Sequence, residues 1–123
     1  MEVLVVDFNS PDAPRQLAQS LHSSGFAILK NHPIPYELVE RGFKAWAEFF
    51  ASDSKMDFLY DPCKEGAQDG FFPFKSENAK GYDKKNLMEF FHYYRWGRLP
   101  PIATSETAEL FSKMEALGLG LLR

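Results

Sequence analysis

The chain has 123 residues, of which 45% are hydrophobic and 25% are charged, and its formal net charge is −3. This balance is ordinary for a soluble globular protein and excludes an intrinsically disordered chain. Because the two signs of charge are interspersed along the sequence, no basic patch indicates nucleic acid or an anionic membrane as a partner.

The sequence also bears on the cellular compartment. It contains no run of about 18 apolar residues that could span a bilayer. Residues 1–8 (MEVLVVDF) lack the basic start and the cleavage site of a signal peptide. The single cysteine, Cys63, rules out an intramolecular disulfide and suits a reducing environment. We therefore expect a cytoplasmic protein that does not contact membranes.

The first part of the chain predicts two short strands with a helix between them. Residues 3–8 (VLVVDF) and 26–29 (FAIL) are apolar runs typical of buried strands. The helix between them should begin near Pro11, which suits a first helical position, and end at Gly25, a natural left-handed cap. A turn rich in proline follows the second strand at residues 31–35.

Residues 35–51 carry the strongest helical pattern in the chain. Apolar side chains recur at helical spacing, with charged side chains on the opposite side. We expect the apolar stripe to be buried. It consists of Val39, Phe43, Trp46 and Phe50, widened by Leu38, Ala47 and Phe49.

The rest of the chain predicts loops, one strand and one helix. Glycines and prolines interrupt residues 52–85, so we expect loops with short extended pieces. Residues 87–96 (LMEFFHYYRW) are rich in aromatic side chains and predict a strand. Ser105 or Thr104 should then cap a last helix. Its apolar stripe runs nearly to Arg123, so we expect a truncated or partial chain, and the stripe consists of Leu110, Met114, Leu117 and Leu121.

Two groups of short motifs occur in a characteristic order. The first group comprises Val6, Asp7, Gly25, Phe26, Asn31, His32, Ile34, Pro35, Phe49 and Phe50. The second comprises residues 70–74 (GFFPF), Glu77, Gly81 and residues 85–93 (KNLMEFFHY). This ordered set covers nearly the whole chain and resembles the N-terminal region of the isopenicillin N synthase-like iron(II)/2-oxoglutarate-dependent dioxygenase family. Pro33 stands where that family usually has glycine.

The resemblance implies an α+β fold. Residues 1–123 would supply the N-terminal helices and short strands of a jelly-roll (double-stranded β-helix) dioxygenase, truncated before the iron-binding part of the barrel. We therefore expect one N-terminal domain in this chain and the catalytic barrel beyond residue 123.

The resemblance also implies a cofactor set. Members of the family hold Fe(II) with two histidines and a carboxylate, two of which come from a His-x-Asp/Glu motif. Neither His22, His32 nor His92 begins such a motif. We therefore expect Fe(II) and 2-oxoglutarate in the full-length protein, no catalytic residue and no metal ligand in this chain, and no activity from the chain by itself.

Substrate contacts are expected around the third predicted strand. The resemblance implies that this strand joins the large sheet of the barrel, where some inward side chains approach the substrate. Alternate side chains share a face of a strand, so His92 and Tyr94 would lie together, and Arg95 could pair with a substrate carboxylate. We take His92, Tyr94 and Arg95 as substrate-binding candidates. Core packing of the aromatic residues and surface pairing of Arg95 with Glu89 or Asp83 are the alternatives.

Three further residues belong to the structural motif of the family rather than to its chemistry. They are Asp7, at the end of the first strand, and Asn31 and His32, in the turn after the second. We expect His32 to form a hydrogen bond that fixes this turn.

Two functions remain open on this reading. In the first, the longer parent protein couples oxidative decarboxylation of 2-oxoglutarate to hydroxylation, desaturation or ring closure of a small molecule, and this chain supplies scaffold and part of the substrate pocket. In the second, the chain is a non-catalytic remnant or protein-interaction module that associates with another protein or with itself through its exposed C-terminal helix.

Overall fold

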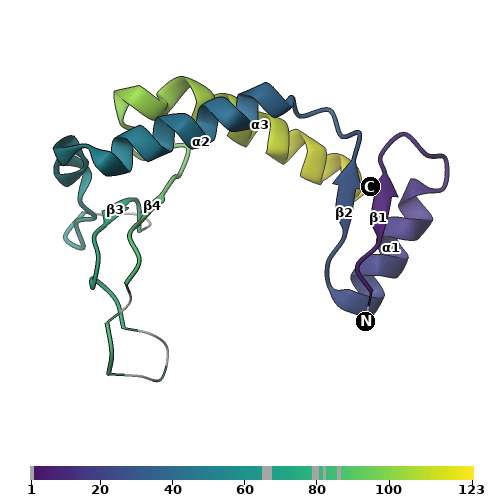
Figure 1. The fold of residues 1–123 in the computed structure, drawn as a ribbon, viewed down its shortest axis with the longest axis horizontal. Helices are drawn as coiled ribbons and strands as arrows, with labels where there is room; N and C mark the ends of the chain where they lie inside the picture. The colour runs from purple at the N-terminus through teal and green to yellow at the C-terminus, as the bar shows by residue number, and fades with distance from the viewer. Residues whose placement is uncertain (1, 65–67, 79–80, 82, 86) are drawn as a thin grey trace. The chain divides into compact units, whose positions relative to one another are not determined.

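The computed structural model describes residues 2–64, 68–78, 81, 83–85 and 87–123. Its elements, in chain order, are β1 (Val5–Asp7), α1 (Ala13–Ser24), β2 (Ile28–Lys30), α2 (Tyr36–Ala51), the 3-10 helix η1 (Asp53–Phe58), β3 (Gly70–Phe72), β4 (Phe90–His92), the 3-10 helix η2 (Pro101–Ala103) and α3 (Thr104–Leu121) (Figure 1). This mixture of helices and short strands agrees with the predicted α+β class. Within the described part of the chain, no helix is long and apolar enough to cross a membrane.

The chain forms two compact units. The first consists of Met1–Pro35 with Ser112–Arg123, and the second is the intervening segment Tyr36–Phe111. Helix α3 therefore contributes its first part to the second unit and its last part to the first.

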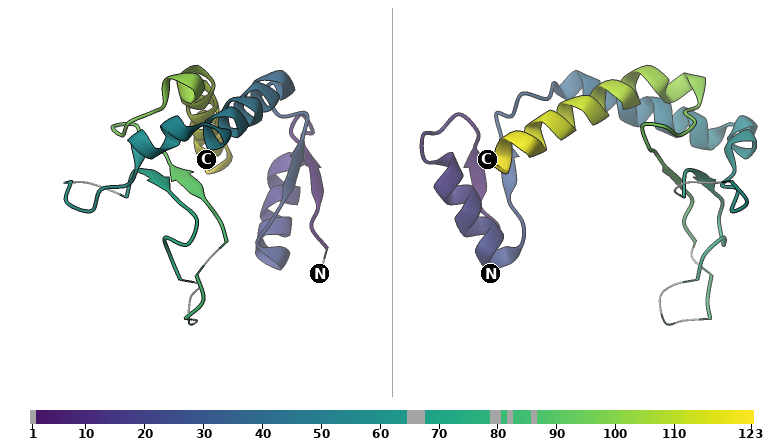
Figure 2. Two further views of the ribbon diagram at one scale, coloured as in Figure 1. Left: turned by 60° about the vertical axis from the view of Figure 1, so that its left-hand side comes forward. Right: turned by 180° about the vertical axis from the view of Figure 1, so that it is seen from behind.

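The first unit is built on a parallel pair of strands connected through α1. Strand β1 pairs with β2 so that Val6 lies opposite Leu29, and α1 runs beside them in each view (Figure 2). Val6 is fully buried. The predicted left-handed cap of α1 is confirmed, because Gly25 has φ 77° and its N–H donates to the carbonyl of Leu21 at 2.9 Å. The helix begins at Ala13, two residues later than expected, because a turn precedes it.

A buried serine ties this helix to both strand segments. The Oγ of Ser20 accepts a hydrogen bond from the backbone N–H of Leu4 at 3.0 Å and donates one to the carbonyl of Phe26 at 2.6 Å. Ser20 is fully buried. Its hydroxyl therefore satisfies backbone groups just before each strand, where the ladder of a two-stranded sheet ends.

The core of the second unit is aromatic. Strands β3 and β4 pair antiparallel with Phe71 opposite Phe91. The fully buried ring of Phe49, from α2, meets both of these rings edge-on, at centroid distances of 6.1 Å and 5.5 Å. Trp46 adds a contact of 4.8 Å to Phe91. Edge-to-face packing of this kind is the favoured geometry for aromatic pairs.

The buried face of α2 differs from the predicted stripe. Phe43 was expected to be buried but is 76% exposed. The positions that are buried share one side of the helix and are Leu38, Gly42, Ala45 and Phe49. Gly42 explains the shift, because a Cβ at this position would lie 2.7 Å from Leu110 Cδ1 of α3. The small residue allows close helix contact on that side and leaves Phe43 outside it.

Helix α3 begins at Thr104, which was expected as a possible cap and is instead its first residue, and its apolar stripe is only partly covered. Leu110 and Leu117 are half-buried, whereas Met114 is 60% exposed. Leu121 is also exposed, and no described residue of α3 is fully buried. The prediction of a continuous buried stripe is therefore wrong. Leu110 belongs to the second unit and Leu117 to the first, and each is half-buried.

Candidate functional site

The β3–β4 hairpin has two faces with different surroundings. Phe71 and Phe91 lie on the face that packs against α2. On the opposite face, Phe72 lies across from Phe90, and Gly70 lies across from His92. The side chains on this second face, together with Tyr60, are here named the aromatic face: Tyr60, Phe72, Phe90 and His92.

Near-parallel rings make up most of the aromatic face. Phe72 is buried between Tyr60, at 4.8 Å and 17° between planes, and Phe90, at 4.7 Å and 12°. The imidazole of His92 is tilted and lies 5.0 Å from the ring of Phe72 and 4.9 Å from that of Phe90. Each such ring pair contributes about 0.5–1.5 kcal/mol beyond area burial, so the cluster holds His92 in place.

His92 is further oriented by a backbone group. Its Nδ1 lies 3.0 Å from the carbonyl oxygen of Gln68. A carbonyl oxygen only accepts hydrogen bonds, so Nδ1 carries the hydrogen and donates it. The side chain is half-buried, which leaves part of the ring accessible.

The predicted continuation of this strand through Tyr94 is wrong. Strand β4 ends at His92, and a turn follows in which the N–H of Gly97 donates to the carbonyl of Tyr94 at 2.9 Å. Alternation along a strand therefore does not place Tyr94 beside His92. The ring of Tyr94 instead contacts that of Trp96 at 5.3 Å.

Arg95 also belongs to the turn after β4. Its guanidinium carbon lies 5.2 Å from the ring centroid of Phe111, a cation–π arrangement. Glu89, an expected partner of Arg95, forms an ion pair with Lys55 at 3.0 Å. Lys55 also donates to the carbonyl of Phe50 at 2.8 Å in the last turn of α2.

Glu89 lines an open cavity on the α2 side of the hairpin. The cavity has a volume of about 360 Å³ and is lined by Trp46, Phe50, Glu89, Phe90 and Phe91. Both members of the Lys55–Glu89 pair are largely covered. The carboxylate is therefore already neutralised by a close cation, and the pair contributes to fixing η1 against β4.

The three motif residues of the first unit lie around one turn. Asn31 Nδ2 donates to Asp7 Oδ2 at 3.0 Å, and the N–H of Asn9 donates to Asp7 Oδ1 at 3.0 Å. These two bonds, with Lys30 nearby, hold the pKa of Asp7 below its ordinary value. Asn31 has φ 59°, a left-handed conformation that asparagine tolerates well. His32 Nδ1 accepts from the N–H of Ile34 at 3.3 Å.

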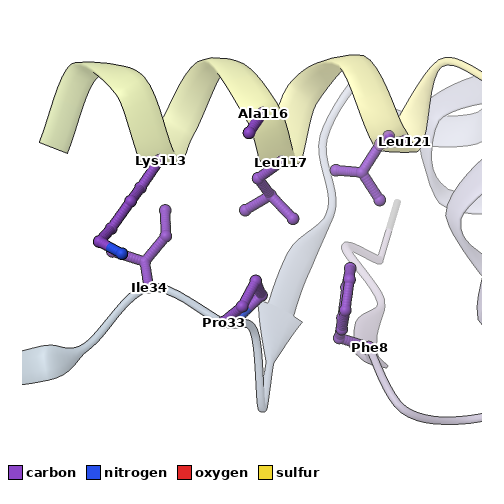
Figure 3. Close-up of a pocket in the computed structure, with 8 residues that line it drawn as sticks. Phe8, Pro33, Ile34, Lys113, Ala116, Leu117 and Leu121 are labelled. Carbon is purple, nitrogen blue, oxygen red and sulfur yellow. The ribbon is translucent and has the colours of Figure 1, made fainter. Parts of the chain in front are cut away.

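A separate apolar cavity in the first unit was not expected from the sequence. Its volume is about 380 Å³, and its lining is Phe8, Pro33, Ile34, Lys113, Ala116, Leu117, Gly120 and Leu121. Leu117 and Leu121 point from α3 toward Pro33 and Phe8 (Figure 3). The leucine spacing on α3 was the available signal, but it did not identify the turn at residues 31–35 as the partner.

The described residues do not fit an iron centre. Across the described part of the chain, no three His, Cys, Asp or Glu side chains come together in an arrangement that could hold a metal ion. A non-haem iron site needs a facial set of such ligands. We therefore assign no described residue to iron and derive no catalytic step for this chain.

Comparisons with known proteins found a family model and a solved structure to which the chain is similar. The family model described as "non-haem dioxygenase in morphine synthesis N-terminal" matches residues 4–112. A solved structure described as that of "a Putative oxygenase from Shewanella oneidensis" is similar, with 33% sequence identity and a TM-score of 0.84. The similarity covers 99% of this chain and 41% of that chain, so the chain spans less than half the length of that protein. No curated protein sequence matches.

Proposed function

Because this chain belongs to the family of non-haem dioxygenase N-terminal regions, we propose that it is the N-terminal part of an iron(II)/2-oxoglutarate-dependent oxygenase acting on a small molecule. The family match over residues 4–112 carries the proposal. The similar oxygenase supports it, because this chain corresponds to 41% of that protein. In the proposal, a jelly-roll barrel that holds iron and 2-oxoglutarate is encoded beyond residue 123.

The role that we assign to this chain is to supply scaffold and one edge of the substrate pocket. The aromatic face supplies the apolar surface, and His92 supplies a polar group held in a defined orientation. Small-molecule sites combine these two features, a largely apolar lining and a few well-placed polar groups. Tyr94 and Arg95 would reach the same pocket from the turn that follows β4. The hydrogen bonds of Asp7, Asn31 and His32 would stabilise the conformation of the turn before α2.

The test begins with the reading frame beyond Arg123. We expect it to encode a His-x-Asp/Glu motif, then a distant histidine and an arginine. The longer protein, supplied with Fe(II), ascorbate and a panel of small molecules, should release carbon dioxide from 2-oxoglutarate in an iron-dependent way. The 123-residue chain under the same conditions is the matched control and should release none. An intact downstream motif without decarboxylation on any member of the panel would contradict the proposal.

A second candidate function rests on exposed apolar residues at the end of this chain. Met114 and Leu119 of α3 are 60% and 55% exposed, and Leu122, directly after the helix, is 86% exposed. Apolar side chains left uncovered in this way favour association with another surface. A non-catalytic module that self-associates through α3 should therefore run above 14.1 kDa in light scattering. A monomer at every accessible concentration would exclude this candidate.

A further inference from the structure

The surroundings of His92 define which atom the imidazole can offer to a ligand. Gly70 lies directly across the ladder from His92, so no side chain stands opposite the imidazole. Gly70 has φ 106°, and a Cβ there would lie 2.6 Å from the carbonyl oxygen of Phe58. The position is therefore restricted to glycine, because the backbone of residues 58–60 packs where a side chain at position 70 would lie.

The hydrogen bond to Gln68 fixes the tautomer. Nδ1 donates to the Gln68 carbonyl over 3.0 Å, and a neutral imidazole carries only one N–H. In the neutral imidazole with this hydrogen bond, the other nitrogen, Nε2, holds a lone pair and can only accept. This is the less common tautomer of a histidine side chain free in water, so the protein selects it.

We propose that His92 accepts a hydrogen bond through Nε2 from the substrate, and that the substrate therefore belongs to the class of planar, largely apolar molecules bearing a hydroxyl or N–H donor. The planar group follows from the aromatic face, where Tyr60, Phe72 and Phe90 already form a near-parallel stack that another ring can extend. The donor follows from the lone pair on Nε2. That this face lines a substrate pocket rests on the function proposed above.

The tautomer is tested first and needs no ligand. Long-range 1H–15N spectra of the labelled chain, recorded where His92 is neutral, distinguish the protonated ring nitrogen from the one with a lone pair. We expect the proton on Nδ1. The exposed His22 of α1 serves as the internal control and should show the tautomer of a free side chain. A proton on Nε2 of His92, or the same tautomer mixture at both histidines, overturns the proposal.

The ligand class is tested with phenol and anisole. The two probes share ring and oxygen, but only phenol has a donor. Titrations followed through the His92 and Phe90 signals should give phenol a Kd about 2- to 10-fold lower, the contribution of one net hydrogen bond. Equal affinities, or no saturable binding of phenol, overturn the proposal.

Two variants assign the preference to Nε2. In His92→Gln, the amide reaches the place of Nε2 and can accept, so the preference for phenol should persist. In His92→Asn, the amide replaces Nδ1 and can donate to Gln68 but reaches no further, so the preference should disappear. His22→Gln controls for a general effect of histidine replacement. Loss of the preference in His22→Gln, or its persistence in His92→Asn, would refute the assignment.

These results are independent of the turnover assay. Failure of decarboxylation by the longer protein, with the tautomer and the phenol preference observed, would remove the oxygenase function but leave the binding site. Active decarboxylation together with a proton on Nε2 of His92 would support the oxygenase function and overturn the proposed role of His92.

Discussion

Replacement of Ser20 by alanine tests how the first unit is held together. The Oγ of Ser20 is buried and serves two backbone groups, the N–H of Leu4 and the carbonyl of Phe26. In Ser20→Ala, the N–H of Leu4 loses its acceptor. The carbonyl of Phe26 has another donor within reach. Ser24 Oγ lies 2.8 Å from the carbonyl of Ser20 and 2.9 Å from that of Phe26, and its single hydroxyl hydrogen can turn to the latter. The variant therefore leaves one backbone group unsatisfied rather than two.

Because only one backbone group loses its partner, the expected loss in free energy of unfolding is that of a single unsatisfied donor. A donor left without a partner away from water costs about 1–3 kcal/mol. Leu4 is only half-buried, so water can partly replace the serine, and we expect the lower part of that range, about 1–2 kcal/mol. Urea unfolding followed by circular dichroism measures the loss. Hydrogen exchange at the amide of Ile28, which donates to the Leu4 carbonyl at 3.0 Å, locates it in the β1–β2 pair.

Ser23→Ala is the matched control. The exposed Ser23 Oγ donates to the carbonyl of Ser20 at 3.2 Å, within the helix itself. Its removal should change the free energy of unfolding by less than about 0.5 kcal/mol, as is usual for surface positions. Should Ser20→Ala prove no more damaging than Ser23→Ala, with Ile28 equally protected, the serine would not be the link between α1 and the strands.

Three other substitutions probe the fold. Phe49→Ala should lower the free energy of unfolding by about 3–5 kcal/mol in denaturant titrations, whereas Phe43→Ala, on the exposed side of α2, should cost less than about 0.5 kcal/mol; equal losses would contradict the observed face. Gly70→Ala should cost about 1–3 kcal/mol, because φ is 106° and a backbone oxygen lies 2.6 Å from the new Cβ, and a normal hydrogen-exchange pattern in β3–β4 would refute this. The hydrogen bond from Asn31 holds the pKa of Asp7 in the folded protein below 3.8, its ordinary value. The ionised Asp7 therefore stabilises the fold above pH 3.8, and this stabilisation is lost as the pH falls through the folded pKa. Asp7→Asn should therefore flatten the acid limb of a stability–pH curve, and an unchanged limb would argue against the pairing.

Local signals predicted much of the fold. Gly25 marked the end of α1, and the predicted cap at Thr104 or Ser105 lies within one residue of the start of α3, because caps and turns depend on a few adjacent residues. The buried face of α2 was misjudged because Phe43 is at least as apolar as its neighbours. The deciding contact joins Gly42 to Leu110, far away in the sequence, and no periodicity within α2 reports it.

The candidate site was predictable to a similar degree. The family pattern directed attention to His92, which does lie on one face of a hairpin. The strand was predicted to be longer than it is, because aromatic residues continue past its end. The turn at Tyr94 was not predicted. The orientation of the imidazole depends on a backbone carbonyl at Gln68, 24 residues earlier. A backbone group carries no signature in the sequence, so the tautomer could come only from the structure.

The order in which the units are completed differs from the order of the chain. The first unit needs both Met1–Pro35 and Ser112–Arg123, whereas the second is the continuous segment Tyr36–Phe111. During synthesis, the second unit has all of its residues available while the first still lacks the end of α3. Closing the first unit also carries the entropy cost of a long intervening loop, which is smaller once that loop has folded. Strands β1 and β2, which precede the second unit along the chain, would therefore reach their final packing after it.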